Sequence, residues 1–292
     1  MTLITAAALR DLLAGTTDTD APVAVLDVRW TLAHPDGRDA FAAGHIPGAA
    51  YVDLDSQLSD HSRTGLGRHP LPTGPALQES LRALGVSDGD TVVVYDDAQA
   101  AGSSRAWWTL TAAGLNDVRI LDGGWAAWRA DGGEIETGTG RTPTPGDVSV
   151  PHDDLYAGAR RVLTKGQAAY TGEHGVLLDA RAPERYRGET EPVDPVAGHI
   201  PGAANLPSTS VLDEGGRFLP PDELRGVFAG LGVRPTTAGD PVSGAYCGSG
   251  VSAAVLVAAA DSVGIDLALF PGSWSQWSQN LLDNPGSTTG LS

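Results

Sequence analysis

The sequence predicts an α/β protein of two similar domains, each a parallel β-sheet flanked by helices on both faces. Residues 44–50 and 198–204 share the sequence GHIPGAA, which indicates an internal repeat. In each half, short runs of Val, Leu and Ile alternate with stretches of helical composition, as in parallel sheets covered by helices. The chain of 292 residues is also long enough for two domains of roughly 130 to 150 residues.

The expected strands occur in the same order in both halves. VLDVR at 25–29 precedes the first GHIPGAA copy, and LLDAR at 177–181 precedes the second. Both are apolar runs that reach an Asp, as a buried parallel strand does at its carboxyl end. Farther along, residues 91–95 match 242–246, and residues 122–128 match 270–277. We therefore interpret the halves as two copies of one domain.

Helices are expected between these strands. We predict an amphipathic helix near the start of the chain and four more in the body of the two copies, over residues 1–16, 76–84, 105–113, 221–231 and 252–263. Ligands of such sheets bind beyond the carboxyl ends of the strands. The functional site is therefore expected at that edge.

The two copies are separated by a stretch of linker composition. Residues 136–154 are rich in Thr, Gly and Pro and have no hydrophobic period. We predict a first domain over residues 1–138, a linker over 139–155 and a second domain over 156–292.

Composition and charge exclude several classes of partner. A hydrophobic fraction of 41% and a charged fraction of 19% are typical of a folded protein. The net charge of −17 disfavours binding to nucleic acid or to an anionic membrane. The start of the chain lacks the pattern of a secretory signal, and the longest apolar stretch, residues 251–260, is far shorter than the roughly 20 residues of a membrane span. We expect a cytoplasmic protein with no nucleic-acid or membrane partner.

The single cysteine, Cys247, is the first candidate for chemistry. One cysteine excludes an intramolecular disulfide and a metal site of several cysteines. Cys247 follows the expected strand 242–246 and begins the loop CGSGV, which leads into the expected helix 252–263. The glycines let backbone N–H groups point inward, and the helix adds the positive end of its dipole. We therefore expect Cys247 to be largely thiolate, the reactive form.

Two chemistries suit such a loop: sulfur transfer, and phosphate-ester hydrolysis through a cysteinyl-phosphate. The phosphatase pattern places an arginine after five intervening residues, where it clamps the phosphate bidentately. Here that position is Ala253. The phosphatase hypothesis therefore lacks its main electrostatic group.

The motifs together resemble a known family. The loop CGSGVS at 247–252, the two GHIPGA segments and GSWSQW at 272–277 resemble the two-domain rhodanese family, specifically its 3-mercaptopyruvate sulfurtransferase branch. The resemblance covers almost the whole chain. In that family the first domain has lost its cysteine, and Asp96 stands at the corresponding position here. The resemblance implies a catalytically inactive first domain and one active site, in the second.

The resemblance also implies roles for individual residues. Arg185 falls where the family binds the anionic group of the donor, a contact to which guanidinium is suited. Ser249, His69 and Asp55 match a relay that would polarise the donor carbonyl or protonate the leaving group. Asp53 remains an alternative to Asp55, because the loop at 59–67 is longer than the family form. The expected catalytic residues are Cys247, Ser249, His69 and Asp55; the expected substrate-binding residues are Arg185, Gly248, Gly250, Val251 and Ser252.

One position departs from the mercaptopyruvate branch. There a second arginine follows a Glu-Pro pair, whereas Glu191 and Pro192 are followed here by Val193. Half of the expected carboxylate clamp is therefore predicted to be missing.

The expected function is transfer of a sulfane sulfur from 3-mercaptopyruvate to a thiol or cyanide through a Cys247 persulfide, with no metal or organic cofactor. The partners are then a small anionic donor and an acceptor, and a thioredoxin-like protein is one candidate thiol. Thiosulfate is the alternative donor. The thiosulfate-preferring branch has basic side chains where Gly248 and Ser249 stand here, so the neutral loop favours mercaptopyruvate. A non-catalytic binding module is a third hypothesis, disfavoured because Cys247 is present.

Overall fold

The computed structural model describes residues 1–16, 21–235 and 242–283. The chain divides into two compact units, each of which is described by itself. Unit 1 contains Met1–Asp60, Leu71–Arg160 and Leu212–Phe218, and unit 2 contains His61–Pro70, Arg161–Val211 and Leu219–Ser292. Two short segments therefore belong to the unit formed mainly by the other half of the sequence.

In the described part of unit 1, one parallel sheet of five strands has the order β1-β5-β4-β2-β3. The strands are β1 Leu3–Ile4, β2 Val23–Asp27, β3 Ala50–Tyr51, β4 Thr91–Tyr95 and β5 Val118–Leu121. All residues of β4 are buried, as expected for a central strand with helices on both faces. This confirms the predicted parallel α/β architecture.

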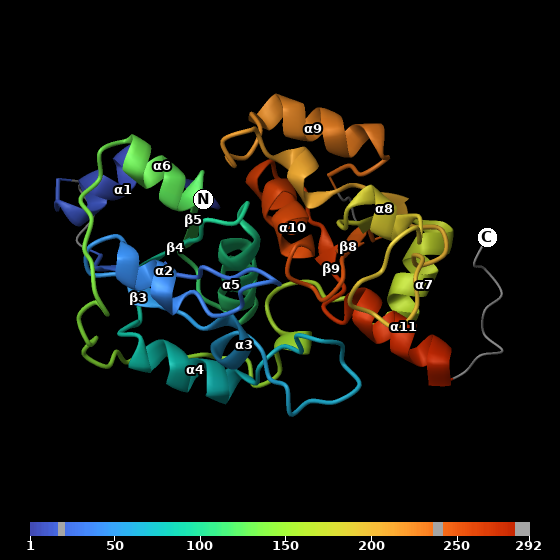
Figure 1. Cartoon of the computed structure of the whole chain (residues 1–292), viewed down its shortest axis with the longest axis horizontal. Helices are drawn as coiled ribbons and strands as arrows, with labels where there is room; N and C mark the ends of the chain where they lie inside the picture. The colour runs from blue at the N-terminus through green and yellow to red at the C-terminus, as the bar shows by residue number, and fades with distance from the viewer. Residues whose placement is uncertain (17–20, 236–241, 284–292) are drawn as a thin grey trace. The chain divides into compact units, whose positions relative to one another are not determined.

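Helices cover both faces of this sheet. The first face carries α1 Ala6–Leu13, α2 Arg38–Ala43 and α6 Gly124–Ala130, and the second carries α3 Leu54–Gln57, α4 Gly74–Ala83 and α5 Ala101–Ala112. Figure 1 shows α1 and α6 side by side, with α4 on the opposite side of the strands.

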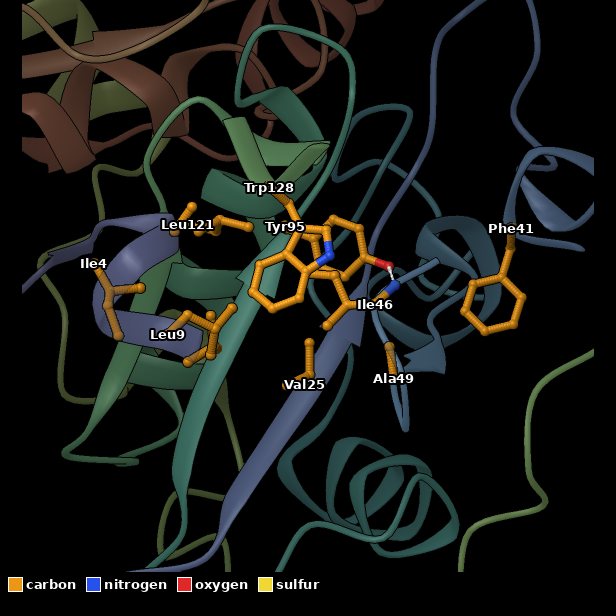
Figure 2. Close-up of a cluster of buried hydrophobic side chains, with 11 residues drawn as sticks. Ile4, Leu9, Val25, Phe41, Ile46, Ala49, Tyr95, Leu121 and Trp128 are labelled. Atoms are coloured by element: carbon orange, nitrogen blue, oxygen red, sulfur yellow. Dashed lines mark hydrogen bonds between the residues drawn. The ribbon is translucent and has the colours of Figure 1, made fainter. Parts of the chain in front are cut away.

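A buried cluster on the first face ties the GHIPGAA segment to the sheet. Figure 2 shows Ile46 beside Val25 and Tyr95 from the strands, and Phe41 belongs to the same buried cluster. The Tyr95 hydroxyl accepts the N–H of Ile46 at 3.2 Å, and burial raises the pKa of Tyr95, so the hydroxyl stays protonated. Unit 2 repeats this contact, since the Tyr246 hydroxyl accepts the N–H of Ile200 at 3.0 Å.

Unit 2 has the same architecture. Its sheet has the order β7-β6-β8-β9, all parallel, with β6 Leu177–Asp179, β7 Ala204–Asn205, β8 Gly244–Tyr246 and β9 Ala268–Leu269. Val162 adds a parallel bridge to Leu269, at the place that β1 holds in unit 1. The helices of this half are α7 Lys165–His174, α8 Pro183–Tyr186, α9 Pro221–Gly230, α10 Ala253–Ser262 and α11 Ser273–Asp283, and 3-10 turns lie at Leu155–Ala157 in unit 1 and Ser208–Val211 in unit 2.

The predicted helices over 76–84, 105–113, 221–231 and 252–263 correspond to α4, α5, α9 and α10. The start of the chain corrects the predicted helix over 1–16. Leu3 and Ile4 pair with β5 as a strand, and α1 begins only at Ala6 because Thr5 caps it by accepting the N–H of Ala8 at 3.2 Å. Among the described residues, no helix is long and apolar enough to cross a bilayer.

The predicted linker over 139–155 belongs to unit 1. The N–H of Gly146 donates to the Arg82 carbonyl at 2.8 Å, and the Val148 side chain is buried. Residues 284–292, at the end of the predicted second domain, lie outside the described residues.

The two exchanged segments occupy equivalent places in the repeat. His61–Pro70 follows the first GHIPGAA copy and α3, and Leu212–Phe218 follows the second copy and the 3-10 turn Ser208–Val211. In unit 1, the N–H of Phe218 donates to Oδ1 of Asp122 at 2.9 Å. Each unit is therefore completed by a loop from the other half of the sequence.

Candidate active site

Cys247 lies directly after β8, at the carboxyl edge of the unit 2 sheet where the site was expected. The start of α11 holds its loop in place. The Cys247 carbonyl accepts the N–H of Trp274 at 2.9 Å, and the Gly248 carbonyl accepts the N–H of Ser275 at 2.9 Å. The N–H of Cys247 donates to Oγ of Ser273 at 3.1 Å. The GSWSQW motif thus fixes the backbone of the cysteine loop.

One backbone N–H of the loop points at the sulfur. The N–H of Gly250 donates to Sγ of Cys247 at 3.1 Å, and α10 begins shortly afterwards at Ala253. Gly250 has φ +81°, and a Cβ on it would lie 2.5 Å from the Pro271 carbonyl oxygen, so only glycine fits there. An inward N–H and a helix N-terminus stabilise negative charge on the sulfur. The predicted reactivity of Cys247 stays a prediction.

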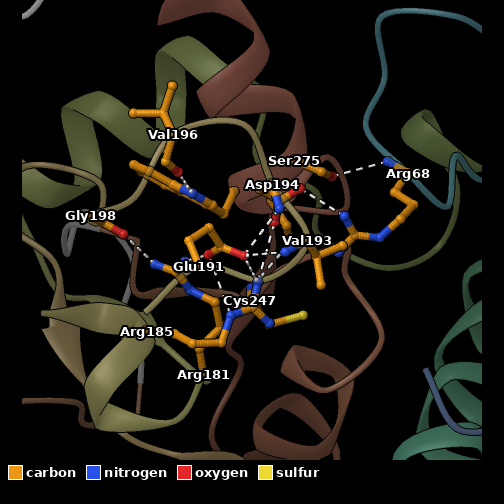
Figure 3. Close-up of polar contacts among 12 residues, drawn as sticks. Arg68, Arg181, Arg185, Glu191, Val193, Asp194, Val196, Gly198, Cys247 and Ser275 are labelled. Atoms are coloured by element: carbon orange, nitrogen blue, oxygen red, sulfur yellow. Dashed lines mark hydrogen bonds and ion pairs between the residues drawn. The ribbon is translucent and has the colours of Figure 1, made fainter. Parts of the chain in front are cut away.

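Two guanidinium groups border the residue after the cysteine. A Cβ on Gly248 would lie 3.1 Å from Nη2 of Arg68 and 3.6 Å from Nη1 of Arg185. Arg185, on α8, was predicted from the resemblance. Arg68 was not, although it precedes His69 in the motif RHPLP; the placement of His61–Pro70 in unit 2 brings it to the loop. Figure 3 shows both arginines converging on the region of Cys247.

Glu191 holds Arg185. Nη2 of Arg185 lies 2.6 Å from Oε1 of Glu191, and Nη1 of Arg181 lies 3.2 Å from its Oε2. The N–H groups of Val193 and Asp194 donate to the same carboxylate. Burial opposes ionisation of Glu191, but these hydrogen bonds outweigh it and lower its pKa. Glu191 is therefore charged at neutral pH and fixes the position of Arg185.

Asp194 joins the two arginines. Its Oδ1 lies 2.7 Å from Nη1 of Arg68, and its Oδ2 lies 3.4 Å from Nη2 of Arg185. The Asp194 side chain is only 3% exposed, whereas those of Arg68 and Arg185 are 25% and 18% exposed. Burial raises the pKa of Asp194, against the opposing effect of Arg68. The carboxylate is thus covered while both guanidinium groups still reach solvent.

The remaining predicted residues fall into both units. Ser249 is buried in the cysteine loop, and His69 is buried in the segment His61–Pro70 of unit 2, with its ring edge-on to His61 at 6.0 Å. Val251 is buried two residues after Ser249, and Ser252 precedes α10. Asp55 belongs to unit 1, so the relay of Ser249, His69 and Asp55 stays a prediction.

Asp53, the alternative to Asp55, has structural partners. Its Oδ1 accepts the N–H groups of Asp55 and Ser56 and so caps α3. Its Oδ2 lies 3.0 Å from Nη2 of Arg38. These bonds engage both oxygens of Asp53, and the choice between Asp53 and Asp55 stays a prediction.

The corresponding loop of unit 1 contains a carboxylate instead of a thiol. The Asp96 carbonyl accepts the N–H of Trp125 at 2.8 Å, just as Cys247 accepts that of Trp274. The Asp96 side chain accepts the N–H groups of Ala98, Ala100 and Ser103 at 2.9, 3.2 and 2.7 Å. Burial raises the pKa of Asp96, and these N–H bonds oppose the shift. In unit 1, the Asp96 carboxylate therefore accepts the N–H groups of its own loop.

Comparison with known proteins identifies the two copies. The family model of the rhodanese-like domain matches residues 5–131 and again residues 164–280. The chain is 56% identical over 279 residues to the putative thiosulfate sulfurtransferase SseB of Mycobacterium tuberculosis, covering 95% of this chain and 94% of the relative. It is 44% identical over 261 residues to a probable 3-mercaptopyruvate sulfurtransferase of Pseudomonas aeruginosa, covering 87% and 88%.

A solved structure agrees with the sequence relatives. The crystal structure of the 3-mercaptopyruvate sulfotransferase SseA from Escherichia coli matches with a TM-score of 0.77 and 30% identity, over 94% of this chain and 100% of that one. The two family-model matches, the sequence relatives and the solved structure all indicate the same family. The chain belongs to the rhodanese-like family and is a sulfurtransferase built of two rhodanese-like domains.

Proposed function

We propose that the protein moves a sulfane sulfur from 3-mercaptopyruvate to a thiol or cyanide through a persulfide on Cys247. The observation that carries this proposal is the environment of the sulfur. Sγ accepts the N–H of Gly250 at 3.1 Å, and two guanidinium groups border Gly248 beside it. The N–H suits a thiolate nucleophile, and the guanidinium groups suit the anionic end of a small donor.

In the first half-reaction, the Cys247 thiolate attacks the donor sulfur. The new S–S bond forms as the donor C–S bond breaks, and the electron pair of that bond leaves with the organic fragment as the pyruvate enolate. The donor's thiol proton stays on the terminal sulfur, and the enolate takes a proton to become pyruvate. The Ser249 hydroxyl would hydrogen-bond the oxygen on which charge develops, which lowers the barrier.

The donor carboxylate is bound by Arg185 and Arg68. Glu191 holds Arg185 at 2.6 Å, so its guanidinium is positioned before the donor arrives. Arg68 supplies the second guanidinium, which compensates for Val193 at the position of the family's second arginine. The contacts of both groups with the surroundings of Gly248 support this assignment.

In the second half-reaction, an acceptor thiolate or cyanide attacks the terminal sulfur, and Cys247 leaves as thiolate. The reaction therefore follows ping-pong order and is complete without an added electron carrier. A cytoplasmic location suits it, because acceptor thiols remain reduced there. A thioredoxin-like protein is a suitable acceptor.

Thiosulfate is the second candidate donor, favoured by the name of the relative from Mycobacterium tuberculosis and by the two arginines beside Gly248. Two features support mercaptopyruvate instead. The loop side chains at Gly248 and Ser249 are neutral, and the charges of Arg68, Arg185, Glu191 and Asp194 cancel. A site of zero net charge suits a monoanion better than a dianion.

The test is direct loading of the protein. Each donor is mixed with the protein without acceptor, and the intact mass is measured for the gain of one sulfur atom. Values of kcat/KM for both donors with one common acceptor then rank them. We expect loading by both and a higher kcat/KM for mercaptopyruvate. A higher value for thiosulfate would reverse the choice of donor, and failure of every donor to add sulfur would overturn the persulfide.

A further inference from the structure

Asp194 is a buried carboxylate that pairs with both arginines bordering the cysteine loop. Its two oxygens bond to different guanidinium groups, at 2.7 Å to Arg68 and 3.4 Å to Arg185. With a side chain only 3% exposed, its charge is less screened by water than the charge of an exposed carboxylate. Any anion bound by the two arginines therefore also experiences the negative charge of Asp194.

The other carboxylates in the network are more strongly tied to the backbone framework. Asp179 bonds Arg181 at 2.7 Å at the end of β6, and Glu191 accepts two backbone N–H groups besides Arg181 and Arg185. Asp194 instead contacts the two arginines whose guanidinium groups reach solvent. It is thus the carboxylate whose charge acts most directly on an incoming donor.

We infer that Asp194 determines donor specificity by cancelling one positive charge of the Arg68–Arg185 anion subsite, so that monoanionic donors are favoured over dianionic ones. This inference rests on the proposed function. It assigns the choice between a ketoacid and thiosulfate to a residue outside the cysteine loop.

The physical reason is the difference in donor charge. A dianion interacts with each nearby charge about twice as strongly as a monoanion does, so the negative charge of Asp194 penalises thiosulfate more. At an effective dielectric constant of about 20, one unit of charge difference within ~8 Å changes a ratio of binding constants by about tenfold after screening. Removing that charge should shift specificity by this factor.

The experiment compares Asp194→Asn with Glu189→Gln. The amide is similar in size to the carboxylate and keeps an oxygen acceptor for Arg68. Glu189 pairs with Arg187 at 2.7 Å on the surface and is 56% exposed, so its variant changes the net charge equally but away from the site. Values of kcat/KM for thiosulfate and mercaptopyruvate are measured at pH ~7, where the donor thiol is mostly protonated, with one acceptor and at low and high salt.

We expect Asp194→Asn to raise the ratio of thiosulfate to mercaptopyruvate kcat/KM about tenfold at low salt, and less at high salt. Glu189→Gln should leave the ratio unchanged. If both donors load Cys247 but the ratio in Asp194→Asn stays the same or falls, the inference is wrong while the proposed function stands.

A second variant keeps the test decisive if Asp194→Asn folds poorly. Arg68→Gln removes one positive charge from the same subsite, so the ratio should change in the opposite direction by a similar factor. An unchanged or increased ratio in Arg68→Gln would also contradict the inference. Failure of the unmodified protein to gain sulfur from either donor would instead contradict the proposed function.

Discussion

Nη1 of Arg68 lies 2.7 Å from Oδ1 of Asp194, although 126 positions separate the two residues in the sequence. The segment around Arg68 is held in unit 2 by further bonds. The N–H of Arg68 donates to Oγ of Ser275 at 3.0 Å, and Nε2 of Gln276 donates to the Gly65 carbonyl at 2.8 Å. A loop from the first half of the sequence therefore completes the anion subsite of the second.

Replacing Cys247 with Ser should abolish sulfur loading and leave the fold intact. The hydroxyl is similar in size to the thiol but is a far weaker nucleophile at neutral pH, and the sequence has no other cysteine. Intact mass after incubation with donor measures loading, and circular dichroism checks the fold. Sulfur transfer above about a hundredth of the unmodified rate, a loss of ~2.7 kcal/mol in barrier terms, would contradict the mechanism.

Replacing Arg185 with Ala should mainly raise KM for the donor. A carboxylate contact made equally in ground and transition states is uniform binding, and a charge-assisted bidentate contact accounts for about 2 to 4 kcal/mol in kcat/KM. Arg187→Ala is the control, because Arg187 is two residues away and 53% exposed. An unchanged KM in Arg185→Ala for both donors, or an equal rise of KM in Arg187→Ala, would show that Arg185 does not bind the donor.

Replacing Gly248 with Ala should displace the Arg68 guanidinium without unfolding the protein. The new Cβ would lie 3.1 Å from Nη2 of Arg68, close enough that the end of the side chain must move. We expect KM to rise roughly threefold to tenfold, about 0.7 to 1.4 kcal/mol. Gly226→Ala on α9 is the control, since its Cβ meets nothing within 4 Å. Equal kinetics for the two variants would show that Arg68 does not contact the donor.

Replacing Asp96 with Ala should destabilise unit 1 while Cys247 still loads sulfur. Three backbone N–H groups would lose their acceptor, among them that of Ala100, whose φ of 59° lies in the left-handed region. We expect a loss of about 1 to 3 kcal/mol in unfolding free energy. Asp97→Ala, at the adjacent exposed position, should cost less. Equal stability of the two variants in urea titrations would show that the Asp96 carboxylate is dispensable.

The fold was largely predictable because its signals are local and occur twice. The run VLDVR and its counterpart LLDAR mark β2 and β6 by apolar content, and the glycines of the cysteine loop mark the turn between β8 and α10. The strand at the start of the chain was not predictable, because the two residues of β1 have apolar side chains that also fit an amphipathic helix. Only their pairing with Ile120 and Leu121 makes them a strand.

By itself, the sequence determined the repeated α/β architecture and the position of Cys247 at a strand-to-helix loop. It also showed that Val193 stands where the mercaptopyruvate branch has a second arginine. Tertiary structure alone decided which groups meet that loop. It placed Arg68 beside Gly248, joined Arg68 to Arg185 through Asp194, and filled the loop of unit 1 with the Asp96 carboxylate. Strand and loop patterns follow from neighbours a few residues apart, whereas the charge of an anion subsite depends on side chains that approach only after distant segments have packed.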